Sequence, residues 1–171
     1  MSQSRLLFAL SAPEALPASG QILVIGAGTG SDLSALPKDR SVIVQGFRPD
    51  HDALAARGWR VVPDILQATG NFGAAIVMLP RSRMAARAAI ADAAQRVAQG
   101  GPVWLDGPKT DGVDAVLKEL RARPAESVTL AQAHGQLSRF EPRWAWDACR
   151  QGARAPRHRV LPLHLACPPP T

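Results

Sequence analysis

A short apolar run that ends in glycines at alternate positions constrains the fold of this chain more than any other feature. Residues 23–25 are Leu-Val-Ile, and Gly26, Gly28 and Gly30 follow them. Since glycine has no Cβ, the chain can turn sharply here and bring backbone N–H groups close to a ligand. The pattern predicts a buried strand, a glycine turn and then a helix over residues 31–36.

The same alternation of apolar runs and helical segments continues along the chain. We expect strands at residues 21–25, 42–45, 60–62, 74–79 and 103–106. We expect helices at residues 31–36, 52–57, 82–99 and 113–122. Short apolar runs separated by helices are typical of a parallel sheet covered on both faces. Residues 127–132 and 135–140 are joined by a short connection, which requires an antiparallel pair. The predicted fold is α/β: a Rossmann-like doubly wound, mostly parallel sheet with a closing antiparallel strand, as in class I methyltransferases.

Local signals mark the ends of several elements. Residues 4–10 are expected to form a short helix or strand before the prolines at 13 and 17. Ser82 can cap the long helix, and the Gly-Gly-Pro sequence at 100–102 stops it. Asp50 is expected as the N-cap of the helix over residues 52–57.

The spacing of the three glycines indicates which ligand the turn could hold. Gly26, Gly28 and Gly30 suit a site for S-adenosylmethionine, whereas dinucleotide sites place a third glycine where Ser31 stands. In both kinds of site an acidic side chain about 20 residues further on binds the ribose hydroxyls. Gln45 stands at that strand tip, and it lacks the charge that strengthens such a bond. These four residues are candidate cofactor-binding residues without the usual anchor. Alternatively, the glycines serve only the turn.

Composition and charge limit the partners and the compartment. The net charge of +6 and the pI near 10.6 favour a polyanionic partner such as RNA. The alternative is that the chain is simply a soluble protein from a GC-rich genome, in which arginine replaces lysine. Cys149 and Cys167 have no metal-ligand spacing, so no metal is expected. No apolar run approaches the ~20 residues of a membrane span, and no signal peptide is recognisable. These features predict a cytoplasmic protein.

Five basic residues are candidates for RNA contacts: Arg48, Arg81, Arg83, Arg87 and Lys109. Arg81, Arg83 and Arg87 lie at the start of the long predicted helix, near the carboxyl ends of the strands, where ligands bind in open α/β sheets. Lys109 lies in a glycine-bounded loop that could bind phosphate. A solvated helix face and a tight turn are the alternatives for these residues.

An aromatic ring stands next to one of these cations. Phe47 beside Arg48 could stack on an RNA base. The alternative is that Phe47 packs on the sheet edge, Arg48 pairs with a nearby aspartate and His51 is a surface histidine.

The composition changes near Glu141. The segment after it contains five arginines, a terminal triple proline and one acidic residue, Asp147, without a sustained apolar period. We expect a methyltransferase-like domain at residues 1–140 and an irregular Pro/Arg-rich tail at 141–171. We also hypothesise that the authentic reading frame is lost near Glu141, which sequencing of the downstream DNA would test.

Four stretches resemble a known family. They are Val-Gln-Gly-Phe-Arg-Pro-Asp-His-Asp at 44–52, Leu-Pro-Arg-Ser-Arg at 79–83, Asp-Gly-Pro-Lys-Thr-Asp-Gly at 106–112 and Ala-His-Gly-Gln-Leu at 133–137. Together they resemble the N-terminal domain of the ribosomal RNA small subunit methyltransferase C family, over residues 4–140. The resemblance implies two tandem methyltransferase-fold domains, of which the second binds S-adenosylmethionine and methylates a guanine amine in 16S rRNA. It implies that the first is a degenerate copy that supports folding and RNA binding.

The residues needed for base methylation are missing from this chain. Such enzymes usually place Asn/Asp-Pro-Pro-aromatic at the end of the fourth strand, where this chain reads Met-Leu-Pro-Arg at 78–81. The only asparagine is Asn71. We therefore expect no catalytic residue, and a non-catalytic domain truncated before its catalytic partner, with 16S rRNA or the small ribosomal subunit as its target. The alternatives are an active S-adenosylmethionine-dependent methyltransferase that uses the glycine loop, and a non-enzymatic interaction module.

Overall fold

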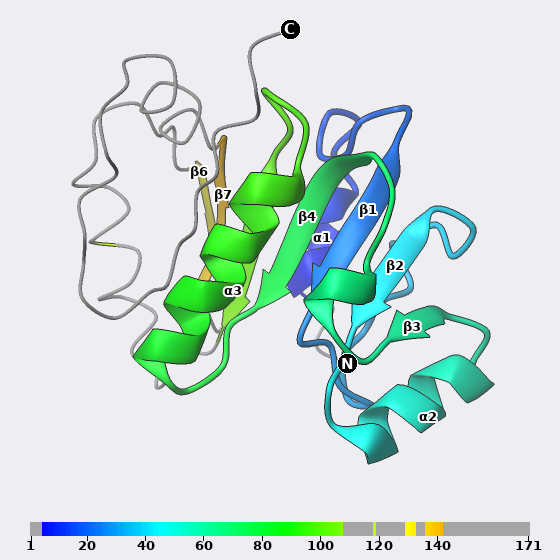
Figure 1. Cartoon of the computed structure of the whole chain (residues 1–171). Coiled ribbons are helices and arrows are strands. Elements are labelled where there is room, and N and C mark those ends of the chain that lie inside the picture. Colours follow the sequence, from blue (N-terminus) through cyan, green and yellow to red (C-terminus); the bar gives the residue numbers. More distant parts are fainter. Residues whose placement is uncertain (1–4, 108–117, 119–128, 133–135, 142–171) are drawn as a thin grey trace, which may run out of the picture.

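A computed structural model describes residues 5–107, 118, 129–132 and 136–141, and Figure 1 shows their arrangement. The helices are α1 (Arg5–Leu10), α2 (Arg48–Ala56), α3 (Arg83–Arg96) and the single 3-10 turn η1 (Ile65–Gln67). The strands are β1 (Gln21–Ile25), β2 (Ser41–Val44), β3 (Arg60–Val62), β4 (Phe72–Met78), β5 (Val103–Gly107), β6 (Thr129–Gln132) and β7 (Gln136–Phe140).

The strands form one seven-stranded sheet in the order β3-β2-β1-β4-β5-β7-β6. The first five strands in this order, β3, β2, β1, β4 and β5, are parallel to one another, whereas β7 is antiparallel to both β5 and β6. The chain order reverses between β1 and β4, so the topological switch point lies beside the glycine turn. The predicted doubly wound sheet with a closing antiparallel strand is confirmed.

Both faces of the sheet are covered, and alternate residues of each strand point to opposite faces. Leu23 of β1 belongs to the core under α3, whereas its neighbours Ile22 and Val24 belong to the core under α1 and α2. Figure 1 shows α3 in front of the sheet and α1 behind it. On the rear face, the buried Trp104 donates from Nε1 to the carbonyl oxygen of Ala15 at 3.0 Å, which fixes the segment after α1.

The predicted helix over residues 31–36 is wrong, because this segment forms turns. Asp32 Oδ1 accepts hydrogen bonds from the backbone N–H of Ser34 at 3.1 Å and from its hydroxyl at 2.6 Å. These bonds, with the hydroxyl bond the larger cause, lower the pKa of Asp32. Side chains that bond to the backbone in this way compete with helix formation, and Pro37 limits the segment to a length at which helices are marginal. Leu33 and Leu36 are nevertheless buried in the rear core.

The ends of the helices differ from those predicted. Helix α2 begins at Arg48, with Phe47 at the N-cap, so Asp50 lies in the first turn and is not the cap. Ser82 does cap α3, since its hydroxyl accepts from Ala85 N–H at 3.3 Å. Helix α3 ends earlier than predicted because Val97 is extended and pairs with the start of β4.

Several other predictions lie outside the described residues. They concern the helix over residues 113–122, described only at Lys118, the candidate Lys109 and the tail after Glu141. Within the part of the chain that the structure describes, no helix is both long and apolar enough to cross a membrane. Nor does this part bring together three His, Cys, Asp or Glu side chains that could hold a metal ion.

Candidate functional site

The candidate site lies at the carboxyl ends of the parallel strands. The glycine loop (residues 26–30) leaves β1, Gln45 follows β2, and Arg81 follows β4. Because β1 lies between β2 and β4, these segments meet at one edge of the sheet, as the sequence predicted. Gln45 and the loop are in direct contact, since Gln45 Nε2 donates to the carbonyl oxygen of Ala27 at 2.7 Å.

Two of the three glycines have contrasting surroundings. Gly26 has a φ of +79°, and a Cβ there would lie 3.0 Å from the carbonyl oxygen of Met78. Its N–H donates to Val44 at 3.0 Å, which ties the turn to β2. Gly26 is therefore required by the backbone itself. Gly30 shows the opposite case, because a Cβ there would meet nothing within 4 Å.

The middle of the loop is bonded to a side chain of α2. Thr29 N–H donates to Asp50 Oδ1 at 3.1 Å, and a Cβ on Gly28 would lie 3.0 Å from Asp50 Oδ2. Gly28 N–H donates to the hydroxyl of Ser31 at 3.1 Å. Arg57 Nη1, just beyond the other end of α2, donates to the carbonyl oxygen of Thr29 at 2.9 Å. The N–H groups of Gly26, Gly28 and Thr29 are thus all bonded within the chain.

Both polar atoms of the Gln45 side-chain amide are hydrogen-bonded to backbone groups. Its Oε1 accepts from Phe47 N–H at 2.9 Å, while its Nε2 bonds to Ala27. A ribose hydroxyl would have to displace one of these backbone partners. Gln45 therefore holds the turn between β2 and α2 against the glycine loop.

These residues do not fit S-adenosylmethionine. A cofactor at a glycine turn uses loop N–H groups and the N-terminus of the following helix, but here no helix follows and Thr29 N–H is bonded to Asp50. The Asp50 carboxylate also places a negative charge against the loop, where a carboxylate or phosphate group of a ligand would lie. Sequence reasoning identified the loop but missed its bond to Asp50, which was expected as a helix cap.

The turn after β4 has no group suited to a flipped base. Leu79 is buried and its N–H donates to the carbonyl oxygen of Asp106 at 2.7 Å, whereas Pro80 and Arg81 are exposed. Neither an amide side chain nor an aromatic ring occurs between Met78 and Ser82.

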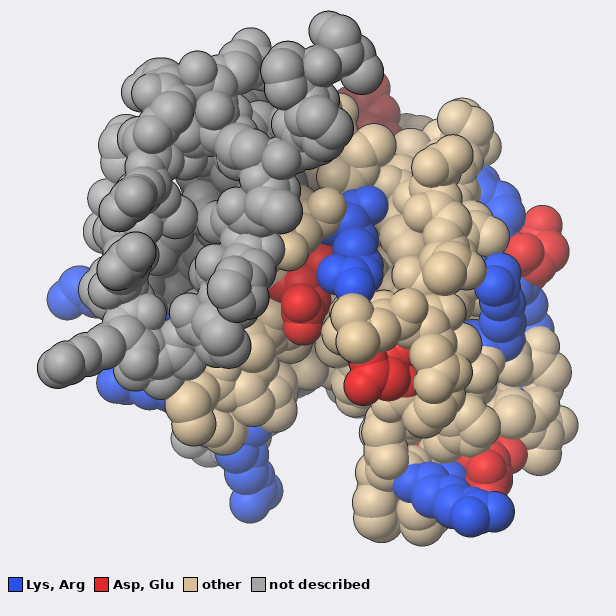
Figure 2. Space-filling view, in the orientation of Figure 1, with Lys and Arg blue, Asp and Glu red and all other residues tan. Residues whose placement is uncertain are grey.

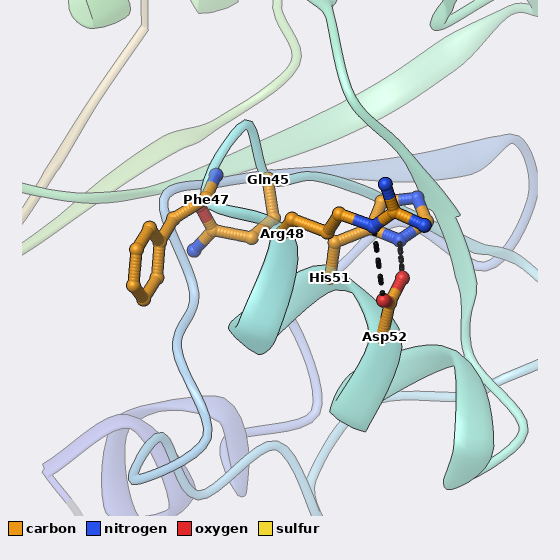
Figure 3. A network of polar contacts seen from close by, with 5 residues as sticks. All are labelled: Gln45, Phe47, Arg48, His51 and Asp52. Carbon is orange, nitrogen blue, oxygen red and sulfur yellow. Dashed lines mark hydrogen bonds and ion pairs between the residues drawn. The ribbon is translucent and has the colours of Figure 1, made fainter.

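The first turn of α2 carries a small polar cluster, shown in Figure 3. Arg48 Nε lies 3.4 Å from Asp52 Oδ2, and His51 Nδ1 lies 3.0 Å from Asp52 Oδ1. The hydrogen bond with His51 is the main reason that the pKa of Asp52 lies below its ordinary value. Arg48 therefore pairs with a nearby aspartate, as one of the two predictions had it. Phe47 does not pack on the sheet edge, since 63% of it is exposed and its ring points away from this cluster.

Basic side chains gather where α3 begins. Arg81 and Arg83 are exposed and Arg87 is half-buried. Residues 80–91 include these three arginines and no acidic residue. Figure 2 shows Lys and Arg side chains at the lower left, the region where α3 begins in Figure 1. Cations at a helix N-terminus oppose the helix dipole, so they weaken the helix slightly.

Comparisons with known proteins connect this geometry to methyltransferases. No protein-family model matches the chain, and no curated protein matches it. Among solved structures, the 16S rRNA N2 methyltransferase RsmC of T. thermophilus, in complex with AdoMet and guanosine, is 22% identical with a TM-score of 0.65. The match covers 81% of this chain and 38% of that one, so the chain spans well under half of that protein.

Two shorter proteins match over nearly their whole length. An rRNA methylase from Streptococcus thermophilus is 16% identical with a TM-score of 0.63, over 82% of this chain and 98% of that one. A Streptococcus mutans protein in complex with SAH is 17% identical with a TM-score of 0.57, over 82% and 99%. With the strand order of the sheet, these likenesses establish that the chain has the class I methyltransferase fold.

Proposed function

We propose that this chain is a non-catalytic methyltransferase-fold domain of an rRNA methyltransferase, which contacts 16S rRNA beside a separate catalytic domain. The observation that carries the proposal is the hydrogen bond from Thr29 N–H to Asp50, at the loop where an active relative would hold its cofactor.

The non-catalytic part follows from what cofactor binding would require. S-adenosylmethionine would have to break the bonds of Asp50 to Thr29 and of Gln45 to Ala27 before it gained any of its own. Even after those changes, the turn at residues 78–82 offers no amide acceptor for a base amine. Among the residues that the structure describes, neither half of the reaction site is available, which supports a role in binding and positioning.

The RNA part follows from the charge at the start of α3. Arg81 and Arg83 project from the ligand-binding edge of the sheet, and such cations contact phosphates without reading sequence. Arg48 lies on the same edge, at the start of α2. Two of the matched structures are rRNA methyltransferases, which makes ribosomal RNA of the small subunit the polyanion we propose. Because the match covers 38% of the T. thermophilus protein, a second domain is the natural place for catalysis.

Calorimetric titration with S-adenosylmethionine tests the non-catalytic part. We expect no saturable heat from the folded chain, whereas the Streptococcus mutans protein that is solved with SAH serves as the positive control. Stoichiometric binding would refute the proposal and would mean that the glycine loop is a functional cofactor site.

Salt-dependent binding of a 16S rRNA fragment tests the RNA part. Affinity should fall steeply with salt, and Arg83→Ala should reduce the slope of log K against log salt by about 0.7, the value for one lost contact to a single strand. Arg60→Ala is the matched control, because Arg60 is an exposed arginine at the opposite, amino end of β3. Equal effects of the two variants would mean that net charge, and not the edge at α3, binds the RNA.

A further inference from the structure

The carboxyl edge of the sheet carries an exposed aromatic ring that the fold does not use. Phe47 is 63% exposed although it lies in the short connection between β2 and α2. A phenylalanine in this position leaves most of its apolar surface in water, and burying it elsewhere would be favourable. The ring therefore has surface to offer a partner.

The backbone under this ring is fixed on both sides. Phe47 N–H donates to Gln45 Oε1 at 2.9 Å, and its carbonyl oxygen accepts from His51 N–H at 3.0 Å. Gln45 is itself anchored to the glycine loop through Ala27. The ring thus projects from a rigid base, and a partner that stacks on it loses little backbone freedom of the protein on binding.

The neighbouring charge suits a nucleotide. The Arg48 side chain is 89% exposed, and its pairing with Asp52 at 3.4 Å is a surface ion pair of the kind that contributes little. The guanidinium can therefore turn to a phosphate without a large loss. Both nearby carboxylates are engaged, Asp52 by His51 and Asp50 by Thr29 N–H, and Figure 3 shows Asp52 on the side of α2 away from the Phe47 ring.

We propose that Phe47 is a stacking platform for an unpaired RNA base, with Arg48 holding the adjacent phosphate. This inference rests on the proposed contact with rRNA and specifies the form of RNA that is bound. The RNA segment must be single-stranded, because a base inside a duplex has no exposed face to stack on the ring. The arginines of α3 then bind the backbone of the same RNA without regard to sequence.

Fluorescence anisotropy with a short single-stranded RNA, and with the same sequence as a duplex, tests this inference on the full chain. Phe47→Leu keeps an apolar side chain but removes the ring, and should weaken single-strand binding by roughly tenfold or more. Phe47→Trp should restore it. Phe8→Leu is the matched control, because Phe8 is also 63% exposed but lies on α1. Circular dichroism would establish that each variant is folded.

The outcomes separate this inference from the proposed function. Normal RNA binding by Phe47→Leu overturns the stacking platform while the arginine contacts stand, and it leaves a protein partner as the explanation of the exposed ring. An equal loss of single-strand and duplex binding in Phe47→Leu also overturns it. No binding of either RNA by the wild-type chain refutes the proposed rRNA contact, and this inference with it.

Discussion

Replacing each glycine of the loop by alanine in turn measures what the loop is built for. Gly26→Ala forces an alanine into the left-handed region, at a cost of about 1–2 kcal/mol. Its Cβ also lies 3.0 Å from the Met78 carbonyl oxygen, which is backbone and cannot easily move. The loss of unfolded-state entropy returns at most ~1 kcal/mol. We expect a net destabilisation of about 1–2 kcal/mol.

The other two glycines should behave differently. Gly28→Ala pushes against the Asp50 carboxylate at 3.0 Å and weakens its bond to Thr29, worth about 1 kcal/mol, so the entropy gain nearly cancels the loss. Gly30→Ala meets nothing within 4 Å and should leave stability unchanged or raise it by up to ~1 kcal/mol.

Urea unfolding followed by circular dichroism gives the three free energies, and thermal melts should shift by roughly 2–4 °C per kcal/mol. In an Asp50→Ala background Gly28→Ala should change from nearly neutral to stabilising by up to ~1 kcal/mol, because the side chain that opposes it is gone and only the entropy gain remains. The reasoning fails if Gly30→Ala is as destabilising as Gly26→Ala, or if Gly28→Ala has the same effect on stability with and without the Asp50 carboxylate.

Three further predictions concern the fold that supports the edge. Ser82→Ala removes the cap of α3 and should cost about 1 kcal/mol in urea unfolding, whereas Ser82→Asp should not. Ile76→Ala, in the fully buried centre of β4, should cost about 2–5 kcal/mol, and a smaller loss would mean that the rear core collapses around the cavity. Desolvation raises the pKa of Asp92 despite the nearby Arg96, so its contribution to stability is present below its ordinary pKa of 3.8 and is lost as pH rises through the raised value. Asp92→Asn should therefore stabilise the chain at pH 7 and change little near pH 3, and equal effects at both pH values would contradict this.

The sheet could be predicted from sequence because its signal is local. Each buried strand is a short apolar run next to a helical segment, and β1 to β5 were placed to within two residues. The helix over residues 31–36 could not be excluded in this way, because its failure depends on the bonds of Asp32 to Ser34. Local sequence patterns also cannot predict the bond between Thr29 and Asp50, because it joins residues 21 positions apart.

The candidate site shows the same division. The sequence placed Gly26, Gly28, Gly30 and Gln45 at one edge, and it showed that Gln45 lacks a charge. It gave no sign that the Gln45 amide would bond to the loop, because that contact exists only once β1 and β2 are paired. The spacing of Asp50 was nonetheless a signal, because Asp50 lies 21 positions after Thr29, close to the separation of about 20 residues at which an acidic side chain can reach a glycine loop.

The bond between Asp50 and Thr29 has a consequence for how such a chain can evolve. A substitution that removes the Asp50 carboxylate leaves the Thr29 N–H without its partner. Replacing Gln45 by glutamate puts a carboxylate oxygen where the amide nitrogen donated to the carbonyl oxygen of Ala27, and the two oxygens repel each other. Each single step back toward a ligand-binding loop lowers stability before any ligand can compensate. Because these bonds must be broken to open the loop, substitutions on the outer surface of this edge cost less stability than substitutions that would open the loop beneath it.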